Sequence, residues 1–328
     1  MNDRTRGRSC PLHYRYRAAD FAVPASARCD VLYVVGGLYG NVPALQRVIA
    51  LFERERGDKR LVFNGDFHWF DVDPAAFAQI QRGVLAFDAT RGNVETELAG
   101  DAADGDVGCG CAYPDWVGDD VVERSNRIIE RLRRTARALP DVCADLARLP
   151  LWRRIDVGDA RVAIVHGDAE SLAGWAFAQE TLRDPAQRAM VERWFSEAQV
   201  EVFASSHTCL PVFQSFARTA RSRCDPLVLN NGAAGMPNLA GAREGLLVRM
   251  ATRPFEGSQR RFGLQRGGLH LDAIAIDYDD LAWRREFLAQ WPPGSDAHAS
   301  YWSRIADGTD HTLADALRVT TEATPTEH

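Results

Sequence analysis

Four polar side chains with metal-binding chemistry follow short apolar runs in this chain. They are one carboxylate, one amide and two imidazoles, at Asp66, Asn93, His166 and His207. Singly, each has an ordinary explanation, because Asp and Asn are common in turns and a strand-end histidine often makes a structural hydrogen bond. Together they form a mixed oxygen and nitrogen ligand set, which suits Mn, Fe, Co, Ni or Zn better than Ca or Mg.

Short apolar runs predict how these four side chains are positioned. Strand-like runs over 31–35 and 61–64 each end at a glycine, and a third predicted strand over 84–87 leads to Asn93. In α/β folds, ligands bind in the crevice at the carboxyl ends of the strands. We therefore expect the four side chains, which lie far apart in the sequence, to build one site.

The rest of the chain mixes helices with many strands. Helices are predicted after residues 43 and 74, over 119–138, 141–148, 185–198 and 280–291, and after residue 300. Strands are predicted over 152–157, 161–165, 201–204, 212–216, 226–229, 245–250 and 271–278. Early alternation of strands and helices followed by many strands predicts a layered α/β protein.

The composition limits the class of function. The chain has 328 residues, 46% of them hydrophobic, and a net charge of -6. That length supports one sizeable core, and the acidic balance disfavours general binding to nucleic acid or to anionic membranes. No apolar run reaches the roughly 18 residues of a membrane span, and the basic N-terminus lacks the apolar segment of a secretory signal. With seven scattered cysteines, we expect a cytoplasmic protein with reduced thiols.

Six segments, in order, resemble the motif blocks of the calcineurin-like metallophosphoesterase superfamily, in its small bacterial and archaeal phosphodiesterase-like branch. The matching blocks are D-x-H-G-N-x-x-A-L, G-D, G-N-x-[DE], H-G, G-H-T-H-x-P and N-x-G-S-x-G-x-P. Their counterparts are Gly36–Leu45, Asn64–Pro74, Arg91–Leu98, Val165–Asp168, Ser205–Phe213 and Asn230–Asn238. The resemblance covers residues 31 to about 250 and implies a four-layer α/β/β/α sandwich with a dinuclear centre at the strand ends.

The resemblance also implies that one metal site is kept and the other is dismantled. The ligands of the kept site correspond to Asp66, Asn93, His166 and His207. In the other site, only the bridging aspartate remains. Its three other ligand positions hold Gly37, Tyr39 and Cys209. Because glycine has no side chain and tyrosine ligates only as a phenolate, with an ordinary pKa of about 10, we expect one divalent transition metal per chain in preference to two.

The activity implied by the family is hydrolysis of a phosphodiester or a small phosphomonoester by a metal-bound hydroxide. Tyr39 is expected to donate a hydrogen bond to a phosphoryl oxygen where the lost metal would lie. The family often places a histidine acid after the G-N pair, but that position is Val94 here, so His68 is the candidate proton donor. Cys209 would be either a ligand or a spectator.

Two alternatives remain open from the sequence. The first is a rebuilt centre in which Cys209, His68 and the Cys109/Cys111 pair supply ligands, and a thiolate-rich set favours zinc or iron. The second is a non-hydrolytic metal-binding pseudoenzyme that binds a phosphorylated ligand or a protein partner. Since every loss falls on one site and every ligand of the other is kept, the sequence favours metal binding and hydrolysis.

We divide the chain into an N-terminal extension (1–30), a metallophosphoesterase domain (31–280) and a C-terminal helical extension with a tail (281–328). Substrate specificity is expected in three loops that match no family motif, around 67–75, 99–118 and 168–180. The expected partner is a small phosphoester substrate.

Overall fold

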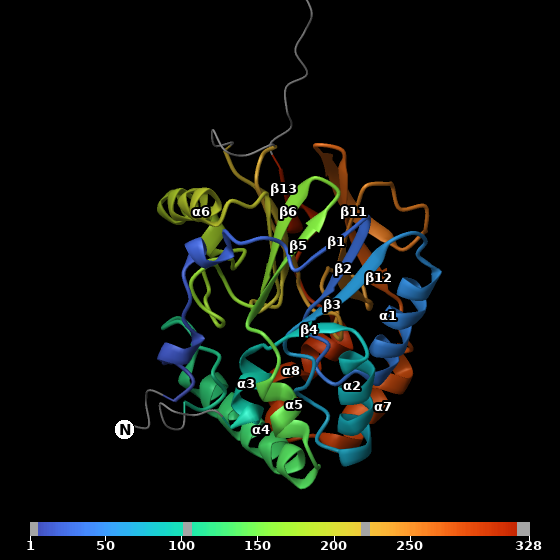
Figure 1. Cartoon of the computed structure of the whole chain (residues 1–328). Helices are drawn as coiled ribbons and strands as arrows, with labels where there is room; N and C mark the ends of the chain where they lie inside the picture. Colours follow the sequence, from blue (N-terminus) through green and yellow to red (C-terminus); the bar gives the residue numbers. More distant parts are fainter. Residues whose placement is uncertain (1–5, 101–106, 218–223, 320–328) are drawn as a thin grey trace, which may run out of the picture.

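A computed structural model describes residues 6–100, 107–217 and 224–319 as two β-sheets with helices on either side (Figure 1). One sheet has the order β1 (Ala27–Cys29), β5 (Trp152–Val157), β6 (Ala160–Val165), β7 (Val202–Ser205), β9 (Leu227–Asn231), β8 (Pro211–Ser215) and β13 (Leu317–Arg318). The other has the order β11 (Arg260–Arg266), β12 (Leu269–Ile276), β10 (Gly245–Ala251), β2 (Val31–Val35), β3 (Lys59–Asn64) and β4 (Asp88–Thr90).

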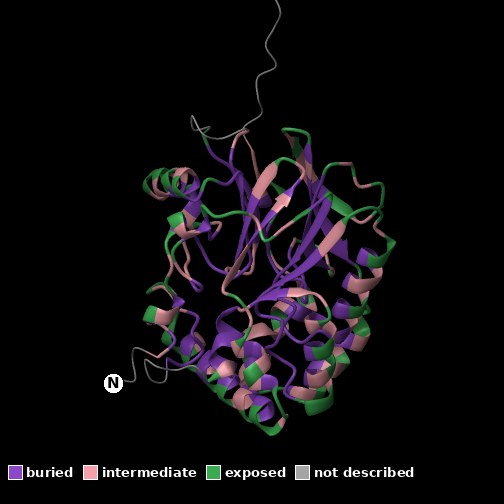
Figure 2. Ribbon diagram, viewed as in Figure 1, coloured by how far each residue is buried: buried purple, intermediate pink, exposed green. Residues whose placement is uncertain are grey.

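The two sheets pack face to face over a core of aliphatic side chains. Leu32, Val34 and Val62 from one sheet lie in the same buried cluster as Ile155 and Ile164 from the other. Burying both faces of a strand requires apolar residues throughout, and Figure 2 shows the central strands almost entirely buried. This contact forms the two inner layers.

Helices cover the outer faces of both sheets. Helix α6 (Pro185–Ala198) packs on the seven-stranded sheet, whereas α1 (Val42–Arg54), α2 (Pro74–Leu85) and α7 (Asp280–Gln290) belong to the core on the other side. The starts of α1 and α2 follow from their sequences, since Asn41 and Asp73 cap them through side-chain oxygens and a proline stands in each first turn. The expected four-layer α/β/β/α sandwich is therefore confirmed.

A further group of helices lies at one end of the sandwich (Figure 1). These are α3 (Asn93–Ala99), α4 (Asp119–Ala138), α5 (Val142–Ala147) and α8 (Asp296–Asp307), while the short α9 (Leu313–Ala316) precedes β13. Helix α8 is tied to α4 by Arg127–Asp296 at 2.7 Å and Arg124–Ser300 at 2.7 Å. The C-terminal part of the chain thereby packs beside the strand ends where the polar residues meet.

One predicted strand is wrong, and the strands β1, β11 and β13 were not predicted. The strand predicted over 84–87 was wrong, because α2 continues to Leu85 and buries Val84 on its inner face, so that β4 begins only at Asp88. Strand β11 was missed because it is a polar edge strand in which only Phe262 is buried. No helix in the described part of the chain is long and apolar enough to cross a membrane.

Candidate metal centre

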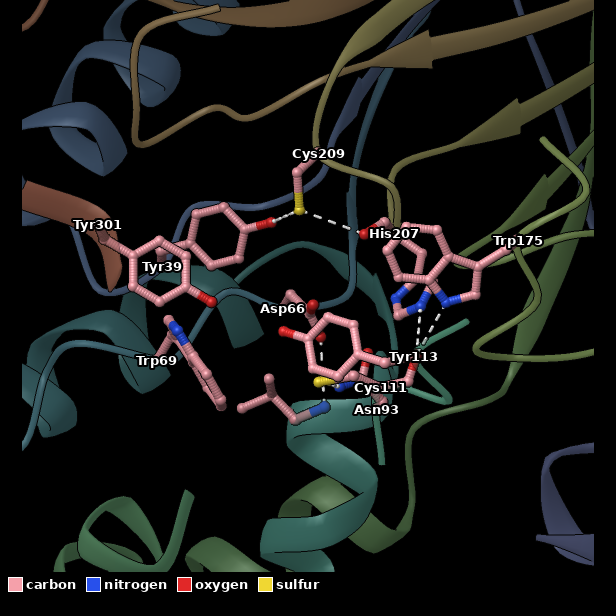
Figure 3. A pocket seen from close by; sticks show the side chains of 11 residues that line it. Tyr39, Asp66, Trp69, Asn93, Cys111, Tyr113, Trp175, His207, Cys209 and Tyr301 are labelled. Carbon is pink, nitrogen blue, oxygen red and sulfur yellow. Dashed lines mark hydrogen bonds between the residues drawn. The ribbon is translucent and has the colours of Figure 1, made fainter. Parts of the chain in front are cut away.

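The four predicted ligands converge in the structure. The Nε2 atom of His166 lies 3.3 Å from Asp66 Oδ2, 3.2 Å from Asn93 Oδ1 and 3.3 Å from His207 Nδ1. They come from the ends of β3, β6 and β7 and from the start of α3, and each is at most 5% exposed. Figure 3 shows Asp66, Asn93 and His207 facing one pocket.

Hydrogen bonds to backbone carbonyls fix the tautomers of both histidines. The Nδ1 atom of His166 lies 3.0 Å from the carbonyl of Asn64, and His207 Nε2 lies 3.1 Å from the carbonyl of Cys111. A carbonyl only accepts, so each of these nitrogens donates its proton. In the neutral rings, the remaining nitrogens therefore turn their lone pairs toward the cluster, which is the arrangement found around metal-binding histidines.

A buried carboxylate holds the loop that carries Asp66. The two oxygens of Glu95 accept backbone N–H groups from Asp66 (2.7 Å), Phe67 (3.0 Å), His68 (3.3 Å) and Gly92 (2.8 Å). These bonds keep Asp66 in a left-handed conformation with φ of 50°, which is a strained state for a residue other than glycine. A Cβ atom at Gly92 would lie 2.2 Å from Asp66 Oδ1, so only glycine fits there.

The electrostatics favour the metal-binding protonation states of Asp66 and His207. At His166, burial by itself lowers the pKa, but the Asp66 carboxylate outweighs burial and raises it, so a metal would displace a proton from that ring. Burial, and then the neighbouring His166, lower the pKa of His207 to about 4, so its ring is neutral at physiological pH. Burial by itself raises the pKa of Asp66, but the His166 ring outweighs burial and the net shift is downward. The cluster thus offers a carboxylate and an unprotonated His207 nitrogen.

This donor set fits a divalent transition metal. Tetrahedral ligands at about 2.1 Å from an ion are roughly 3.4 Å from one another. The three separations around His166 Nε2, between 3.2 and 3.3 Å, are close to that value. Among the described residues, Asp66, His166 and His207 form the one group of histidine, cysteine or acidic side chains with ligand atoms all within 4.8 Å of one another.

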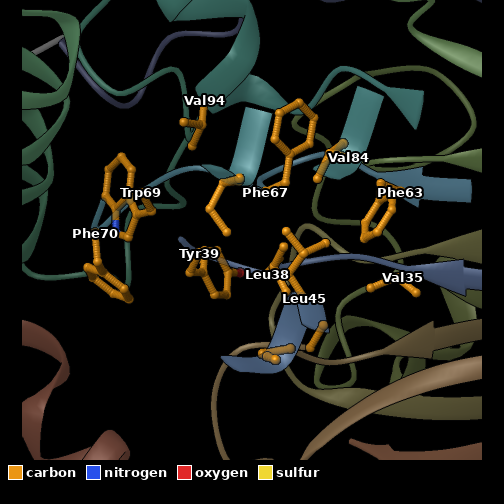
Figure 4. Packing of buried hydrophobic residues seen from close by; sticks show 14 of the residues in the cluster. Val35, Leu38, Tyr39, Leu45, Phe63, Phe67, Trp69, Phe70, Val84 and Val94 are labelled. Atoms are coloured by element: carbon orange, nitrogen blue, oxygen red, sulfur yellow. The ribbon is translucent and has the colours of Figure 1, made fainter. Parts of the chain in front are cut away.

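The residues that correspond to the other metal site of the resembled family, Gly37, Tyr39 and Cys209, form a different arrangement. The Tyr39 hydroxyl lies 2.7 Å from Cys209 Sγ, and that thiol donates to the carbonyl of His207 at 3.2 Å. A Cβ atom at Gly37 would lie 2.8 Å from Cε2 of Tyr39 and 2.9 Å from its hydroxyl oxygen. The phenol thus fills the space next to Gly37, and Figure 4 shows Tyr39 packed with Leu38, Phe67 and Phe70.

The Tyr39–Cys209 pair remains protonated at neutral pH. Burial, followed by the proximity of Cys209, raises the pKa of Tyr39 well above its ordinary value. Burial also raises the pKa of the Cys209 thiol. Neither group is a phenolate or thiolate under these conditions, and the sulfur of Cys209 lies outside the convergent group of ligand atoms. In this structure Gly37 offers no side-chain ligand, and the oxygen of Tyr39 and the sulfur of Cys209 are hydrogen-bonded to each other.

The expectation that His68 supplies a catalytic proton is not supported by its position. The ring is fully buried and stacks on Phe77 at 3.7 Å between centroids. Its Nδ1 lies 2.6 Å from Asp71 Oδ2 and its Nε2 lies 2.9 Å from Gln81 Oε1. Because both ring nitrogens are engaged and His68 does not line the pocket, we assign it a structural role.

The Cys109–Cys111 segment contributes through its backbone. The amide nitrogen of Asn93 donates to the carbonyl of Cys109 at 2.9 Å, and the carbonyl of Cys111 accepts from both His207 (3.1 Å) and Trp175 (3.0 Å). Neither thiol belongs to the convergent ligand group. The segment therefore orients the candidate ligands without supplying a thiolate, a role that the sequence does not signal.

The pocket beside the cluster has a volume of about 60 Å³. Four aromatic residues that sequence reasoning did not assign to the site enclose this pocket: Trp69, Tyr113, Trp175 and Tyr301. The first three lie in the expected specificity loops. The sequence signal that could have identified those three is the presence of tryptophan and tyrosine in loops next to the motif blocks.

Comparisons with known proteins identify the architecture. No protein-family model and no curated protein matches the sequence. The crystal structure of a hypothetical protein from Pyrococcus horikoshii OT3 matches with a TM-score of 0.51 and 14% identity, over 85% of this chain and 99% of that one. A metallophosphoesterase from Sphaerobacter thermophilus matches with a TM-score of 0.49 and 16% identity, over 85% of this chain and 100% of that one. At these identities the likeness concerns the fold.

Proposed function

The chain has the calcineurin-like metallophosphoesterase fold, and on this premise we propose that it is a metal-dependent phosphoesterase. Its substrate would be a phosphodiester or a small phosphomonoester, and its centre would hold one divalent transition metal. Asp66, Asn93, His166 and His207 would be the ligands. A cytoplasmic location remains a prediction from the sequence.

The convergence of these four side chains is the observation that carries the proposal. Burying a carboxylate beside two imidazoles is costly unless the groups are paired or bind an ion. Here Asp66, His166 and His207 direct their free ligand atoms at one point, and the outward nitrogen of each ring is already committed to a carbonyl. This arrangement supports the binding of a cation between the three side chains.

The chain's own residues would position a phosphoester and exclude water. A bound divalent metal supplies Lewis-acid activation of a phosphoryl oxygen and of a water molecule. The Tyr39 hydroxyl, which donates to Cys209 Sγ in this structure, lies where it could instead donate to a phosphoryl oxygen. Its raised pKa keeps it a donor throughout the neutral range. The surrounding aromatic walls would limit the access of solvent.

A non-hydrolytic, metal-binding protein is the second candidate. Two observations favour it: the Tyr39 ring fills the space beside Gly37, and the expected proton donor, His68, is hydrogen-bonded to Asp71 and Gln81 away from the pocket. Such a protein would bind a phosphorylated ligand or a partner without turnover. It differs from the enzyme in a single measurable property, the hydrolysis of any phosphoester.

Turnover of bis(p-nitrophenyl) phosphate and p-nitrophenyl phosphate, assayed with Mn, Fe, Co, Ni and Zn in turn, separates these candidates. The enzyme predicts hydrolysis that is lost in His166→Ala and His207→Ala while both variants stay folded. His298→Ala is the matched control, because its ring stacks on Trp302 rather than facing the cluster. Metal binding without turnover on either ester would overturn the hydrolase and favour the binding protein.

A further inference from the structure

The pocket wall that faces the candidate ligands is built from aromatic rings. Trp69 follows β3, Tyr113 and Trp175 come from the loops before α4 and before α6, and Tyr301 comes from α8 (Figure 3). All four lie outside the residues expected to bind metal. The wall therefore belongs to the part of the site that would recognise the remainder of the substrate.

Trp175 and Tyr113 direct their polar atoms to neighbouring protein groups and leave ring surfaces for the pocket, whereas the Tyr301 hydroxyl points toward the pocket (Figure 3). The indole nitrogen of Trp175 donates to the carbonyl of Cys111 at 3.0 Å, and the Tyr113 hydroxyl lies 3.1 Å from Ser125 Oγ. Trp69 and Tyr301 meet edge to face, at 85° with centroids 6.5 Å apart, and Tyr113 and Trp175 are tilted by 44° with centroids 5.9 Å apart. Because the rings are inclined to one another, they line different sides of the pocket.

The aromatic surface continues from the pocket to the exterior. Trp116 meets Trp175 edge to face, with centroids 6.3 Å apart and an interplanar angle of 90°, and Trp116 is 68% exposed. An exposed carboxylate, Asp115, precedes it in the same segment. Large exposed aromatic side chains next to a cavity are typical of ligand-binding surfaces.

The charges around the pocket disfavour a further anionic group. Asp66 is its one acidic lining residue, and no lysine or arginine lines it among the described residues. Arg304 is nearby, but it lies behind Cys209 and binds the carbonyls of Cys209 (2.8 Å) and Pro237 (2.9 Å). Aromatic faces carry negative potential and attract cations, most strongly those that are weakly hydrated, such as methylated ammonium groups.

The size of the pocket favours a compact group. Its volume of about 60 Å³ is well below the roughly 300–1,000 Å³ of pockets that enclose drug-sized ligands. The same volume also borders Asp66 and His207, so a nucleobase would have to stack outside it, on Trp116. The size of the pocket thus disfavours a base, and its charge and aromatic lining favour a cation.

Building on the proposed function, we infer that the substrate is a phosphoester of a methylated amino alcohol. Its phosphoryl group would lie at the Asp66–His166–His207 cluster, and its quaternary ammonium group would lie against Tyr113, Trp175 and Tyr301. A singly charged phosphodiester that carries such an ammonium group has no net charge. It would therefore need none of the basic side chains that this wall lacks.

Direct binding of choline tests the aromatic cage without any turnover. Quenching of tryptophan fluorescence is titrated with choline chloride and with 3,3-dimethyl-1-butanol, its uncharged isostere. The cage predicts that choline binds at least about tenfold more tightly than the isostere. Tyr301→Leu should weaken choline binding about tenfold, whereas Tyr301→Phe, which keeps the ring, should retain it. Equal affinity for the two compounds, or equal loss in both variants, would overturn the inference.

Three chromogenic esters then separate this inference from the proposed function. We expect p-nitrophenyl phosphorylcholine to be hydrolysed with a kcat/KM at least about tenfold above that of bis(p-nitrophenyl) phosphate or of the p-nitrophenyl ester of thymidine 5′-monophosphate. Preference for the nucleotide ester would overturn the cation assignment in favour of base stacking while leaving the hydrolase intact. Choline binding without turnover of any ester would keep the cage and remove the hydrolase.

Discussion

The hydroxyl of Tyr39 lies 2.7 Å from the sulfur of Cys209, and both residues have left-handed backbones, with φ of 56° and 61°. They stand at two positions where metallophosphoesterase-like chains are expected to carry histidine ligands. In this structure the two positions hold a hydrogen bond between two protonated side chains. Strained backbone of this kind persists where the surrounding structure enforces it.

The space beside Gly37 gives the first prediction. In Gly37→Asp, the new Cβ would lie 2.8 Å from the Tyr39 ring, at a φ of +65°. We expect the free energy of unfolding to fall by about 2–4 kcal/mol. In the triple variant Gly37→Asp, Tyr39→His, Cys209→His, a smaller imidazole replaces the phenol ring and the missing ligands return. Chemical denaturation and metal analysis should show partly recovered stability, since the φ at position 37 is unchanged, and a second metal.

The single and the triple variant together test whether the Tyr39 ring blocks the binding of a second metal. If Gly37→Asp alone were as stable as the wild type and bound a second metal, the Tyr39 ring would not be what blocks the site. Tyr39→Phe serves as the control, because it keeps the ring and should leave the metal content unchanged.

Glu95 is predicted to hold the metal loop together. In Glu95→Gln, one oxygen becomes an amide nitrogen that cannot accept the N–H groups of Asp66 and its neighbours. Leaving buried donors unpaired should cost about 3 kcal/mol of stability, and metal affinity should fall about 10- to 100-fold. Urea unfolding and competition with a metal-sensitive dye measure the two effects. Glu123→Gln, an exposed change on α4, should alter neither, and wild-type metal affinity in Glu95→Gln would contradict the assignment.

Gly110 tests whether the Cys109–Cys111 carbonyls orient the ligands. A Cβ at Gly110 would lie 2.1 Å from the Tyr14 hydroxyl, so Gly110→Ala should displace this segment and weaken metal binding about tenfold or more. Gly294→Ala is matched in φ, +88° against +66°, but no described atom lies within 4 Å of its Cβ. It should cost about 1 kcal/mol of stability and leave metal affinity unchanged. Equal effects of the two substitutions on metal affinity would argue against the assigned role.

A pH dependence is predicted at Glu55, far from the metal cluster. Burial by itself raises its pKa, but ion pairs with Arg249 and Arg253 outweigh burial and lower it to about 2. Because this lies below the unfolded value of about 4.3, the stabilisation is nearly complete above about pH 5 and is lost as the pH falls toward 2.

The Glu55→Gln variant isolates this effect. At pH 7 it should be less stable than the wild type by about 1–2 kcal/mol, because solvent screens part of the ion-pair energy, and the difference should shrink steadily between pH 5 and pH 2. Urea denaturation at several pH values measures it. A difference that stays constant with pH would show that packing rather than charge is responsible.

The sequence was sufficient to predict the sandwich and the convergence of Asp66, Asn93, His166 and His207. Each of these residues follows a strand or opens a helix. In the fold that the order of the motifs resembles, the carboxyl ends of these strands lie together. Strand propensity gave the wrong prediction at 84–87, because the first two residues of this apolar run are the end of α2. There, the burial of Val84 against the core outweighs its preference for strands.

Other parts of the site had no signal in residue types. The carbonyls of Cys109 and Cys111 act through their positions alone, and every residue has a carbonyl. The surroundings of His68 had no signal either, because nothing in the sequence indicates that Asp71 and Gln81 contact its two ring nitrogens. Tyr301 reaches the pocket from α8, beyond the family-like region, through packing between α4 and α8.

The most direct test of a single metal centre is elemental analysis of protein purified without chelators, comparing wild type, His207→Ala and Cys209→Ser. We predict close to one transition-metal ion per chain in the wild type, its loss in His207→Ala and no change in Cys209→Ser. Two ions per chain, or a loss in Cys209→Ser, would mean that the second site has been rebuilt around the thiol. No metal in the wild type would contradict the account at its centre.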